Sequence, residues 1–260
     1  MCLSIVIALI VFASILTCFC IHKFIKVIKV QRTKINALSR SLQETNNKLL
    51  LLRKCKLDNE EYHVLCIGNS ITIHPPYDAI KWYSNHGMAA STPQRDYCHI
   101  LEEKMRKHNP RSTVSPVNIA VWERDFSIKL NTILGEVCKG KNIIVIRLGE
   151  NVLDTKHFNE ALSCLIDYCL TFTTNIILTG QYWKNIEKEK AIISNAHKYG
   201  LIYVPLDWIL ESYPSACSPQ EGDIIYDANG TAYPIEGSFI LSHPNDYGMQ
   251  LIANSIYRSL

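Results

Sequence analysis

Three short segments of the sequence carry side chains of the kinds used in nucleophilic catalysis. Ser70 lies in the sequence GNSIT, Asn151 ends the sequence RLGEN, and His243 lies in the sequence SHPND. A serine hydroxyl is a weak nucleophile and needs an adjacent base to take its proton. Histidine, with an ordinary pKa of about 6.5, is a suitable base near neutral pH. The three segments form one candidate site, provided that the fold brings them together.

Motifs of other common catalytic and cofactor sites are missing from the sequence. The segment 68–72 lacks the second glycine of a G-x-S-x-G elbow, the glycines of a G-x-G-x-x-G dinucleotide turn and the G-K-[ST] end of a phosphate loop. No H-E-x-x-H pair occurs, and the ten cysteines include no C-x-x-C pair. We therefore predict no metal site and no bound cofactor. Most cysteines are interpreted as small buried hydrophobic residues, with a disulfide left as an open alternative.

The elements that would position these segments alternate between strand and helix. Short apolar runs rich in β-branched residues occur at 63–67, 115–121, 142–147, 175–178 and 201–205. Helical patterns occur at 92–107, 126–138, 157–172, 186–198 and 246–259. The alternation predicts an α/β fold with a five-stranded parallel sheet, covered by helices on both faces. Sites in such sheets lie beyond the carboxyl ends of the strands, where Ser70 and Asn151 fall.

The N-terminus is predicted to be a membrane anchor. Residues 2–21 are uncharged and apolar, and a run of about 20 such residues can cross the hydrocarbon core of a bilayer. A buried helix of a globular domain would show a polar stripe, and this run shows none. A cleaved signal peptide is the alternative, but only Met1 precedes the run and a good cleavage site does not follow it. We predict an uncleaved, single-pass transmembrane helix over residues 1–28, so that the membrane is a partner through residues 2–21.

A polar segment separates the predicted anchor from the α/β domain. Over residues 29–57, apolar residues recur at near-heptad spacing among Gln, Asn, Lys and Arg, which predicts a polar helical stalk. The apolar repeat is short for a coiled coil, so self-association through residues 29–56 is an alternative to a simple spacer. The domain itself is predicted to run over residues 58–260.

The charge pattern bears on partners and on topology. The chain has 27 basic and 24 acidic residues, a net charge of +3, and no basic block in its body. We predict no nucleic-acid partner, because nucleic-acid-binding domains carry a concentrated basic face. Several basic residues directly follow the predicted anchor, and the positive-inside rule would keep that flank in the cytoplasm.

Three blocks of the sequence resemble the SGNH, or GDSL-type, hydrolase superfamily. They are GNSIT at 68–72, the G-x-N at 149–151 and the His-Pro before the last predicted helix. The stretches GMAAS at 87–91, NIAVWERDF at 118–126 and HPNDYGM at 243–249 are similar to a bacterial subgroup of that superfamily. The resemblance covers the whole predicted domain. It implies the flavodoxin-like, three-layer α/β/α fold of these hydrolases.

The resemblance also implies a role for each candidate residue. Ser70 would be the nucleophile that forms an acyl-enzyme, and His243 would be the general base. The oxyanion would be held by the peptide N–H of Ser70, the peptide N–H of Glu123 or of a neighbouring residue, and the side-chain amide of Asn151. Supporting positions are Asn69, Gly149 and Glu150.

Two positions depart from the pattern of the superfamily. The second block usually carries a glycine after an Asn-containing strand end, whereas here Asn118 is followed by Ile-Ala-Val-Trp-Glu. The acid that usually stands three residues before the histidine is replaced by Ile240. A backbone carbonyl is one alternative for orienting His243, and a carboxylate from elsewhere in the chain is the other. The candidate carboxylates are Glu150, Asp223 and Glu236.

The resemblance implies a serine esterase that hydrolyses an O-acyl ester. No long apolar lid segment is visible for a fatty chain, so we expect a small acyl group such as acetyl on a carbohydrate. The expected partner is thus a small ester or an acylated glycan. A membrane-tethered glycan O-acyltransferase and a catalytically silent binding module are the alternatives. Because glycan-active members of the superfamily work outside the cytoplasm, we predict an extracytoplasmic domain, against the charge rule.

Overall fold

The computed structural model describes most of the domain and a few positions near the N-terminus. The described residues are 61–227 and 229–260, with helical positions at 23–24, 28–29, 31–32, 34–35 and 38. The chain divides into two units, Met1–Lys56 and Leu57–Leu260. None of the helices among the described residues has both the length and the apolar character that crossing a bilayer requires. The anchor predicted at 1–28 and the stalk predicted at 29–57 fall mostly outside the described residues and stay predictions.

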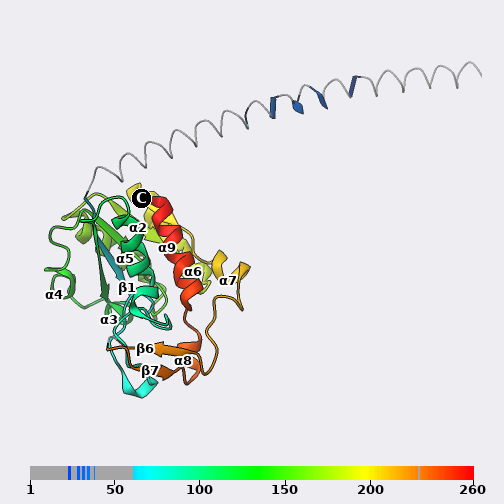
Figure 1. The fold of residues 1–260 in the computed structure, drawn as a ribbon. Helices are drawn as coiled ribbons and strands as arrows, with labels where there is room; N and C mark the ends of the chain where they lie inside the picture. Colours follow the sequence, from blue (N-terminus) through cyan, green and yellow to red (C-terminus); the bar gives the residue numbers. More distant parts are fainter. Residues whose placement is uncertain are drawn as a thin grey trace, which may run out of the picture. The chain divides into compact units, whose positions relative to one another are not determined.

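The second unit is built on a parallel sheet of five strands (Figure 1). The strands are β1 (His63–Gly68), β2 (Thr113–Asn118), β3 (Ile143–Ile146), β4 (Ile176–Thr179) and β5 (Ile202–Val204). They lie in the order β2-β1-β3-β4-β5, and all neighbours are parallel. Strands β3 and β4 are buried along their whole length, as expected of continuous apolar strands inside a doubly covered sheet. The predicted α/β fold on a five-stranded parallel sheet is confirmed.

Helices cover both faces of the sheet and give the domain three layers (Figure 1). The covering helices are α2 (Tyr97–Arg106), α5 (Phe158–Leu170), α6 (Ile186–Tyr199) and α9 (Asp246–Ser259). Helices α2 and α9 pack together on one face, and α5 and α6 pack together on the other. In β1, Val64 and Cys66 belong to the core on the α2 side, whereas Leu65 and Ile67 belong to the core on the α5 side. This division follows from the two-residue repeat of a strand.

The strand predicted at 115–121 ends earlier than expected. Strand β2 stops at Asn118, and the short helix α3 (Ala120–Arg124) begins almost at once. The Asn118 Oδ1 accepts a hydrogen bond from the Ala120 N–H at 2.9 Å, which turns the chain out of the sheet. The apolar run Val-Asn-Ile-Ala-Val-Trp therefore contains a strand end and a helix start, not one continuous strand.

The helix predicted at 126–138 is also shorter in the structure. Only α4 (Leu130–Leu134) forms there. The Asp125 Oδ1 accepts a hydrogen bond from the Ser127 N–H at 2.9 Å, a local turn that competes with helix formation at this point. Further short helices of the domain are η1 (Asp78–Ile80), η2 (Pro93–Arg95) and α7 (Trp208–Ser212).

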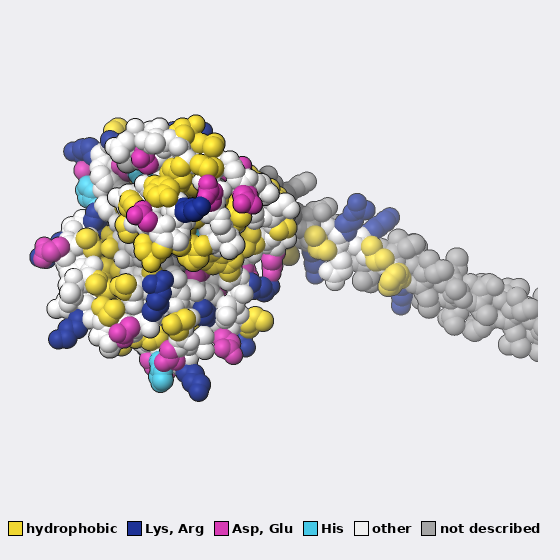
Figure 2. Space-filling model, turned by 90° about the horizontal axis from the view of Figure 1, so that it is seen from below, with side chains coloured by type: hydrophobic (Ala, Val, Ile, Leu, Met, Phe, Trp, Pro, Cys, Tyr) yellow, Lys and Arg dark blue, Asp and Glu magenta, His cyan; other side chains and the backbone are white. Residues whose placement is uncertain are grey.

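A hairpin that the sequence did not predict closes one end of the domain. Strands β6 (Ile224–Tyr226) and β7 (Ala232–Pro234) pair antiparallel and are followed by α8 (Ser238–Leu241), at the lower end of Figure 1. A small separate core with Trp82 and Met88 lies beneath the hairpin. Figure 2 views the molecule from this end and shows hydrophobic side chains exposed among charged ones. Exposed hydrophobic residues include Ile224, Tyr226 and Phe239 of the hairpin and α8. Tyr77 and Tyr83, from the segment that contains Trp82, are exposed as well.

Candidate active site

Ser70 and His243 meet at the carboxyl end of β1. The Ser70 Oγ lies 2.8 Å from the His243 Nε2, although 173 positions separate the two residues in the chain. Ser70 stands in a tight turn, in which the Thr72 N–H donates to the Asn69 carbonyl at 2.9 Å. Gly68 permits this turn, because a Cβ there would lie 1.9 Å from the Thr72 Oγ1. The structure therefore brings together the hydroxyl and the imidazole that the motifs predicted.

A backbone carbonyl orients the His243 ring. The His243 Nδ1 lies 2.9 Å from the carbonyl oxygen of Phe239, which is part of α8. Because a carbonyl oxygen only accepts, Nδ1 carries the proton and the Nε2 lone pair faces Ser70. Ile240, at the place of the usual acid, is fully buried in the small core beneath the hairpin. An acid at this position would have to enter that apolar core.

The three carboxylates considered as orienting groups have other partners. Glu150 pairs with Arg147, Asp223 accepts from the Gln220 N–H, and Glu236 pairs with Lys81. The backbone carbonyl, one of the alternatives left open by the sequence, is thus the orienting group in the structure. A carbonyl dipole stabilises an imidazolium less than a carboxylate does, so Ser70 and His243 make a candidate dyad that lacks the acid of a full triad.

The surroundings of His243 keep its ring neutral. Burial is the largest cause that lowers the pKa of His243, and together with the charges of Arg147 and His74 it brings the pKa to about 4, against the opposing effect of the bond to the Phe239 carbonyl. The rings of Trp183 and Phe239 lie with their centroids 5.4 Å and 5.2 Å from the imidazole. A neutral imidazole is the form that accepts a proton, so the ring is able to act as a base near neutral pH.

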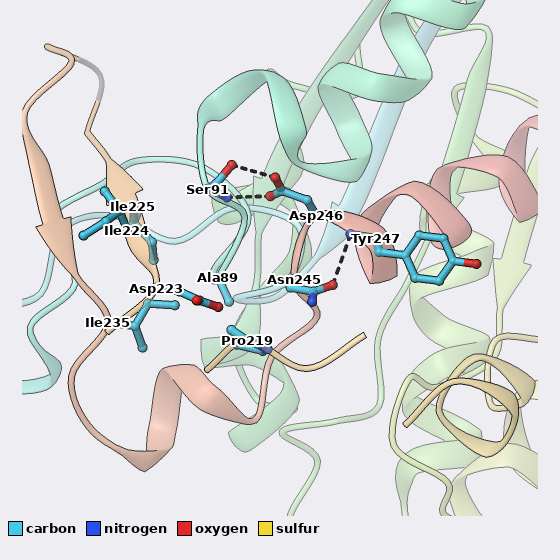
Figure 3. Close-up of a pocket in the computed structure, with 10 residues that line it drawn as sticks. All are labelled: Ala89, Ser91, Pro219, Asp223, Ile224, Ile225, Ile235, Asn245, Asp246 and Tyr247. Atoms are coloured by element: carbon cyan, nitrogen blue, oxygen red, sulfur yellow. Dashed lines mark hydrogen bonds between the residues drawn. The ribbon is translucent and has the colours of Figure 1, made fainter. Parts of the chain in front are cut away.

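The last helix is tied to the loop that follows Ser70. Asp246, in the first turn of α9, accepts hydrogen bonds from the Ser91 N–H at 2.7 Å and from the Ser91 hydroxyl at 2.6 Å (Figure 3). The Met88 N–H donates in turn to the Ser70 carbonyl at 2.8 Å. Ser91 and Asp246 border a cavity of about 370 Å³ beside the hairpin. These contacts fix the segment that carries Ser70 relative to the segment that carries His243. The polar groups of Ser91 and Asp246 are occupied by these hydrogen bonds.

Three polar side chains form a buried ring behind Ser70. The Arg147 guanidinium donates to the Asn69 Oδ1 at 2.7 Å and to the Glu150 Oε1 at 2.6 Å. The Asn69 amide donates to the other Glu150 oxygen at 2.8 Å, which closes the ring. Asn69 and Arg147 are fully buried, and buried charge requires partners of this kind. The ring fixes the backbone next to Ser70, so Asn69 and Glu150 lie where supporting positions were expected.

Glu123 organises a second set of hydrogen bonds through its side chain. Its Oε1 accepts from the Gly149 N–H at 2.6 Å and from the Asn151 N–H at 3.3 Å. Its Oε2 accepts from the Asn151 side-chain amide at 2.8 Å and from the Asn69 amide at 3.2 Å. Each oxygen thus receives two N–H donors, an arrangement that suits the ionised carboxylate, which can only accept. Sequence reasoning had considered only the peptide group of Glu123.

The Glu123 peptide N–H, predicted as an oxyanion donor, is engaged within α3 in the structure. That N–H donates to the Ile119 carbonyl at 3.3 Å within the first turn of α3, because the helix starts before this residue. The side chain, by contrast, is almost completely buried. Burial raises the pKa of Glu123, and the charge of Glu150 raises it further, whereas hydrogen bonds from Asn151, Gly149 and Asn69 act in the opposite direction.

A cavity of about 310 Å³ opens beside the dyad. Its wall includes Ser70, Asn151, Phe239 and the first residues of α3. The peptide N–H groups of Ser70 and Val121 have no hydrogen-bond acceptor among the described residues. The Asn151 amide gives one hydrogen to Glu123 and has a second one to give. Residues that border one cavity therefore carry the Ser70 hydroxyl and three N–H donors from three different segments.

Comparison with known proteins finds similarity in structure. No family model and no curated protein matches the sequence. LAE5, an alpha/beta hydrolase enzyme from the metagenome of Lake Arreo, Spain, has a TM-score of 0.51 at 16% identity, over 78% of this chain and 97% of its own. A two-domain esterase (CEX) active on acetylated mannans has a TM-score of 0.53 at 18% identity, over 81% of this chain and 51% of its own.

A third similar structure is a catalytic mutant of Axe2, an acetylxylan esterase from Geobacillus stearothermophilus. Its TM-score is 0.50 at 14% identity, over 76% of this chain and 93% of its own. The chain spans about half of the length of the two-domain esterase and nearly all of the other two. At such low identities the likeness concerns the fold. The domain has the α/β fold that these hydrolases and esterases share.

Proposed function

We propose that this protein is a serine esterase of the SGNH type that hydrolyses small O-acyl esters, with an acetylated carbohydrate as its substrate. The observation that carries the proposal is the 2.8 Å approach of the Ser70 Oγ to the His243 Nε2 at the carboxyl end of β1. A hydroxyl, a neutral imidazole and N–H donors around one cavity are what acyl transfer through a covalent intermediate requires.

The reaction proceeds in two halves. The Ser70 Oγ attacks the ester carbonyl while the His243 Nε2 takes the hydroxyl proton, and the Phe239 carbonyl holds the ring in place. The tetrahedral intermediate collapses as its bond to the alcohol oxygen breaks, and His243 gives the proton to the departing alcohol. Water then attacks the acyl carbon while the His243 Nε2 takes a proton from it. The bond to the Ser70 Oγ breaks, His243 returns the proton to that oxygen, and the carboxylic acid leaves.

The oxyanion is held by the peptide N–H groups of Ser70 and Val121 and by the Asn151 amide. Val121 thereby takes the role first expected of Glu123. Glu123 is a positioning residue, because its carboxylate holds the Asn151 amide at 2.8 Å and the Gly149 N–H at 2.6 Å. Donors that are fixed before the reaction need no rearrangement when the oxyanion develops.

Two observations support an acetylated sugar as the substrate class. The cavity of about 310 Å³ lies at the small end of ligand pockets, with room for a short acyl group and one sugar ring. The structures with a similar fold include an esterase active on acetylated mannans and an acetylxylan esterase. A fatty acyl chain would need a longer apolar channel than this cavity offers.

Acetate release tests the proposal directly. The purified protein should hydrolyse p-nitrophenyl acetate and release acetate from an acetylated oligosaccharide, and Ser70→Ala should abolish both activities. Ser218→Ala is the matched control, since its hydroxyl donates to the Pro214 carbonyl and does not line the cavity. Acetyl transfer to an added sugar in place of release into water would favour the O-acyltransferase alternative. Complete inactivity of the folded protein would favour the silent binding module.

We also propose that residues 2–21 anchor the protein in a membrane and that the domain lies on the extracytoplasmic side. Cys164 on α5 is exposed and offers a chemical probe of this topology. In intact cells that carry a Cys55→Ser variant, which lacks the thiol of the predicted stalk, a membrane-impermeant maleimide should label the protein, and adding Cys164→Ser should remove that label. Labelling only after the cells are broken would place the domain on the cytoplasmic side.

A further inference from the structure

The cavity beside Ser70 carries a positive charge and no negative one. Arg124 is the single Lys, Arg, Asp or Glu side chain among the described residues that line it. His74 also lines the cavity, but burial lowers its pKa and the nearby charge of Arg124 lowers it further, so its ring is neutral near neutral pH. A bound substrate therefore meets a guanidinium that the described wall of the cavity does not neutralise.

The two acids next to Arg124 in the sequence are engaged elsewhere. The Glu123 carboxylate is buried and accepts from the Gly149 N–H. Asp125 accepts from the Ser127 N–H at 2.9 Å, and its hydrogen bonds from Ser127 hold the pKa of Asp125 below its ordinary value. Within the part of the chain that the structure describes, Arg124 takes part in no ion pair. Its charge is therefore available to a ligand.

Arg124 is held next to the proposed oxyanion site. One of its terminal nitrogens donates to the Asn151 Oδ1 at 3.3 Å, and the Asn151 amide is in turn held by Glu123 at 2.8 Å. A guanidinium presents five N–H donors in a planar fork, and this bond uses one of them. The other donors stay free for an anion in the cavity, at a position that the bond to Asn151 defines.

We infer that the substrate is an O-acylated sugar acid, whose carboxylate binds Arg124 while its ester lies at Ser70. The inference rests on the proposed esterase function and narrows its substrate class. Arginine binds a carboxylate through two parallel charge-assisted hydrogen bonds, which fix the direction of the ligand as well as its position. A carboxylate on the same sugar ring as the ester would therefore orient the ester carbonyl toward the nucleophile. A phosphate offers similar oxygen atoms, and the experiment separates the two anions.

The test uses monoacetylated methyl glycosides that differ only at the exocyclic carbon, which carries a carboxylate, a carboxamide or a phosphate. For the unaltered protein, kcat/KM on the carboxylate should exceed that on the carboxamide by about tenfold or more, as expected for a charge-assisted pair. In Arg124→Gln this ratio should fall to about one, whereas Arg124→Lys should keep part of it, because the charge stays but the planar fork is lost. Arg95→Gln, at an exposed arginine of η2 outside the cavity, should leave the ratio unchanged.

Several results would overturn the inference and leave the esterase function in place. These are equal kcat/KM on the carboxylate and the carboxamide, a ratio unaffected by Arg124→Gln, and a preference for the phosphate over the carboxylate. Equal losses on all three substrates in Arg124→Gln would likewise show that the guanidinium serves Asn151 alone. The proposed function fails separately, by a different result: no hydrolysis of p-nitrophenyl acetate by the unaltered protein.

Discussion

The two sides of the candidate active site are built from different kinds of chemical groups. On the side of the nucleophile, Asn69, Glu123, Arg147 and Glu150 form a buried network of charge-assisted hydrogen bonds. On the side of the base, His243 is enclosed by aromatic rings, and its Nδ1 is oriented by a backbone carbonyl. The first side is rich in ionised groups, whereas no carboxylate among the described residues contacts the imidazole.

The difference follows from what each side has to do. Oxyanion donors must be fixed before the reaction, and one buried carboxylate can hold several N–H groups at once. A general base must be neutral to accept a proton, and burial without an adjacent carboxylate keeps the imidazole neutral. Carboxylates are thus placed where they fix geometry and are kept away from the imidazole, whose protonation state matters. Five substitutions or measurements test this comparison.

The largest effect is expected from removing the base. In His243→Ala, Ser70 loses the group that takes its proton, and kcat should fall by about 10⁴-fold or more. The melting temperature should change little, because the lost imidazole makes only two hydrogen bonds among the described residues that bear on the dyad. One is to the Phe239 carbonyl and the other to the Ser70 hydroxyl. Hydrolysis of p-nitrophenyl acetate and a thermal melt measure the two quantities. Activity retained within about tenfold would mean that another group is the base.

Glu123→Gln should have the next largest effect. Glutamine places an amide N–H₂ against the amides of Asn151 and Asn69, so the oxyanion donor loses its anchor. We expect kcat to fall by about 10²–10³-fold with little change in KM, the range seen on loss of an oxyanion donor. Steady-state kinetics with an acetylated oligosaccharide measures both constants.

A double substitution separates positioning from mere stability. If Glu123 acts through Asn151, adding Glu123→Gln to Asn151→Ala should lower kcat little further. Asn195→Ala is the control, because this buried amide between α5 and α6 bonds to Ser163, Asn159 and Ala191 and should alter the thermal melt but not kcat. Additive losses in the double variant would contradict the positioning role.

Placing an acid at position 240, where the superfamily pattern has one, should destabilise the protein and should not raise its activity. Ile240 is fully buried in the small apolar core with Trp82, Ile225 and Ile235. Ile240→Asp removes a buried hydrophobic side chain and puts a polar group in its place, which should lower the free energy of unfolding by about 3 kcal/mol. Ile240→Val should cost about 1 kcal/mol. Denaturant unfolding measures both, and a gain of activity in Ile240→Asp would show that this position does reach the base.

The smallest expected effect is a shift of the acid limb of the pH profile. Because burial lowers the pKa of His243 to about 4, kcat/KM should stay constant through about pH 6.5, where an ordinary histidine would have lost half of its base form. The same shift affects stability. The unfolded chain binds a proton between these two pH values and the folded protein does not, so the contribution of His243 to stability falls as pH is lowered through this window. A half-loss of kcat/KM near pH 6.5 would contradict a buried base with no carboxylate beside it.

The sheet and the segments of the dyad were predictable because both depend on local patterns. Continuous apolar runs predict buried parallel strands, and the motifs around Ser70 and His243 lie at strand and helix ends. The orienting group was not predictable, since every residue has a carbonyl and nothing in the sequence marks that of Phe239. The side-chain role of Glu123 was missed because the apolar run predicted a continuous strand over 115–121. In the structure Asn118 ends the strand, and Glu123 lies in the short helix that follows. The hairpin was missed because its strands have three residues each.

Contacts between residues far apart in the chain could not be predicted from the sequence either. Ser91 and Asp246 are 155 positions apart, and only the folded chain shows that they join the two loops of the dyad. The charge of Arg124 likewise gains meaning only when the partners of its neighbours are known. In the sequence, Glu123, Arg124 and Asp125 are three successive charged residues, and any of them could have paired with another.

The site of reaction with a fluorophosphonate tests the central claim most directly. This reagent phosphonylates a serine only where a base activates the hydroxyl. The folded protein should gain one equivalent in its intact mass, with the adduct on the peptide that contains Ser70, and both Ser70→Ala and His243→Ala should lose the label. A folded protein that stays unlabelled, or that carries the adduct on another serine, would contradict a catalytic dyad of Ser70 and His243.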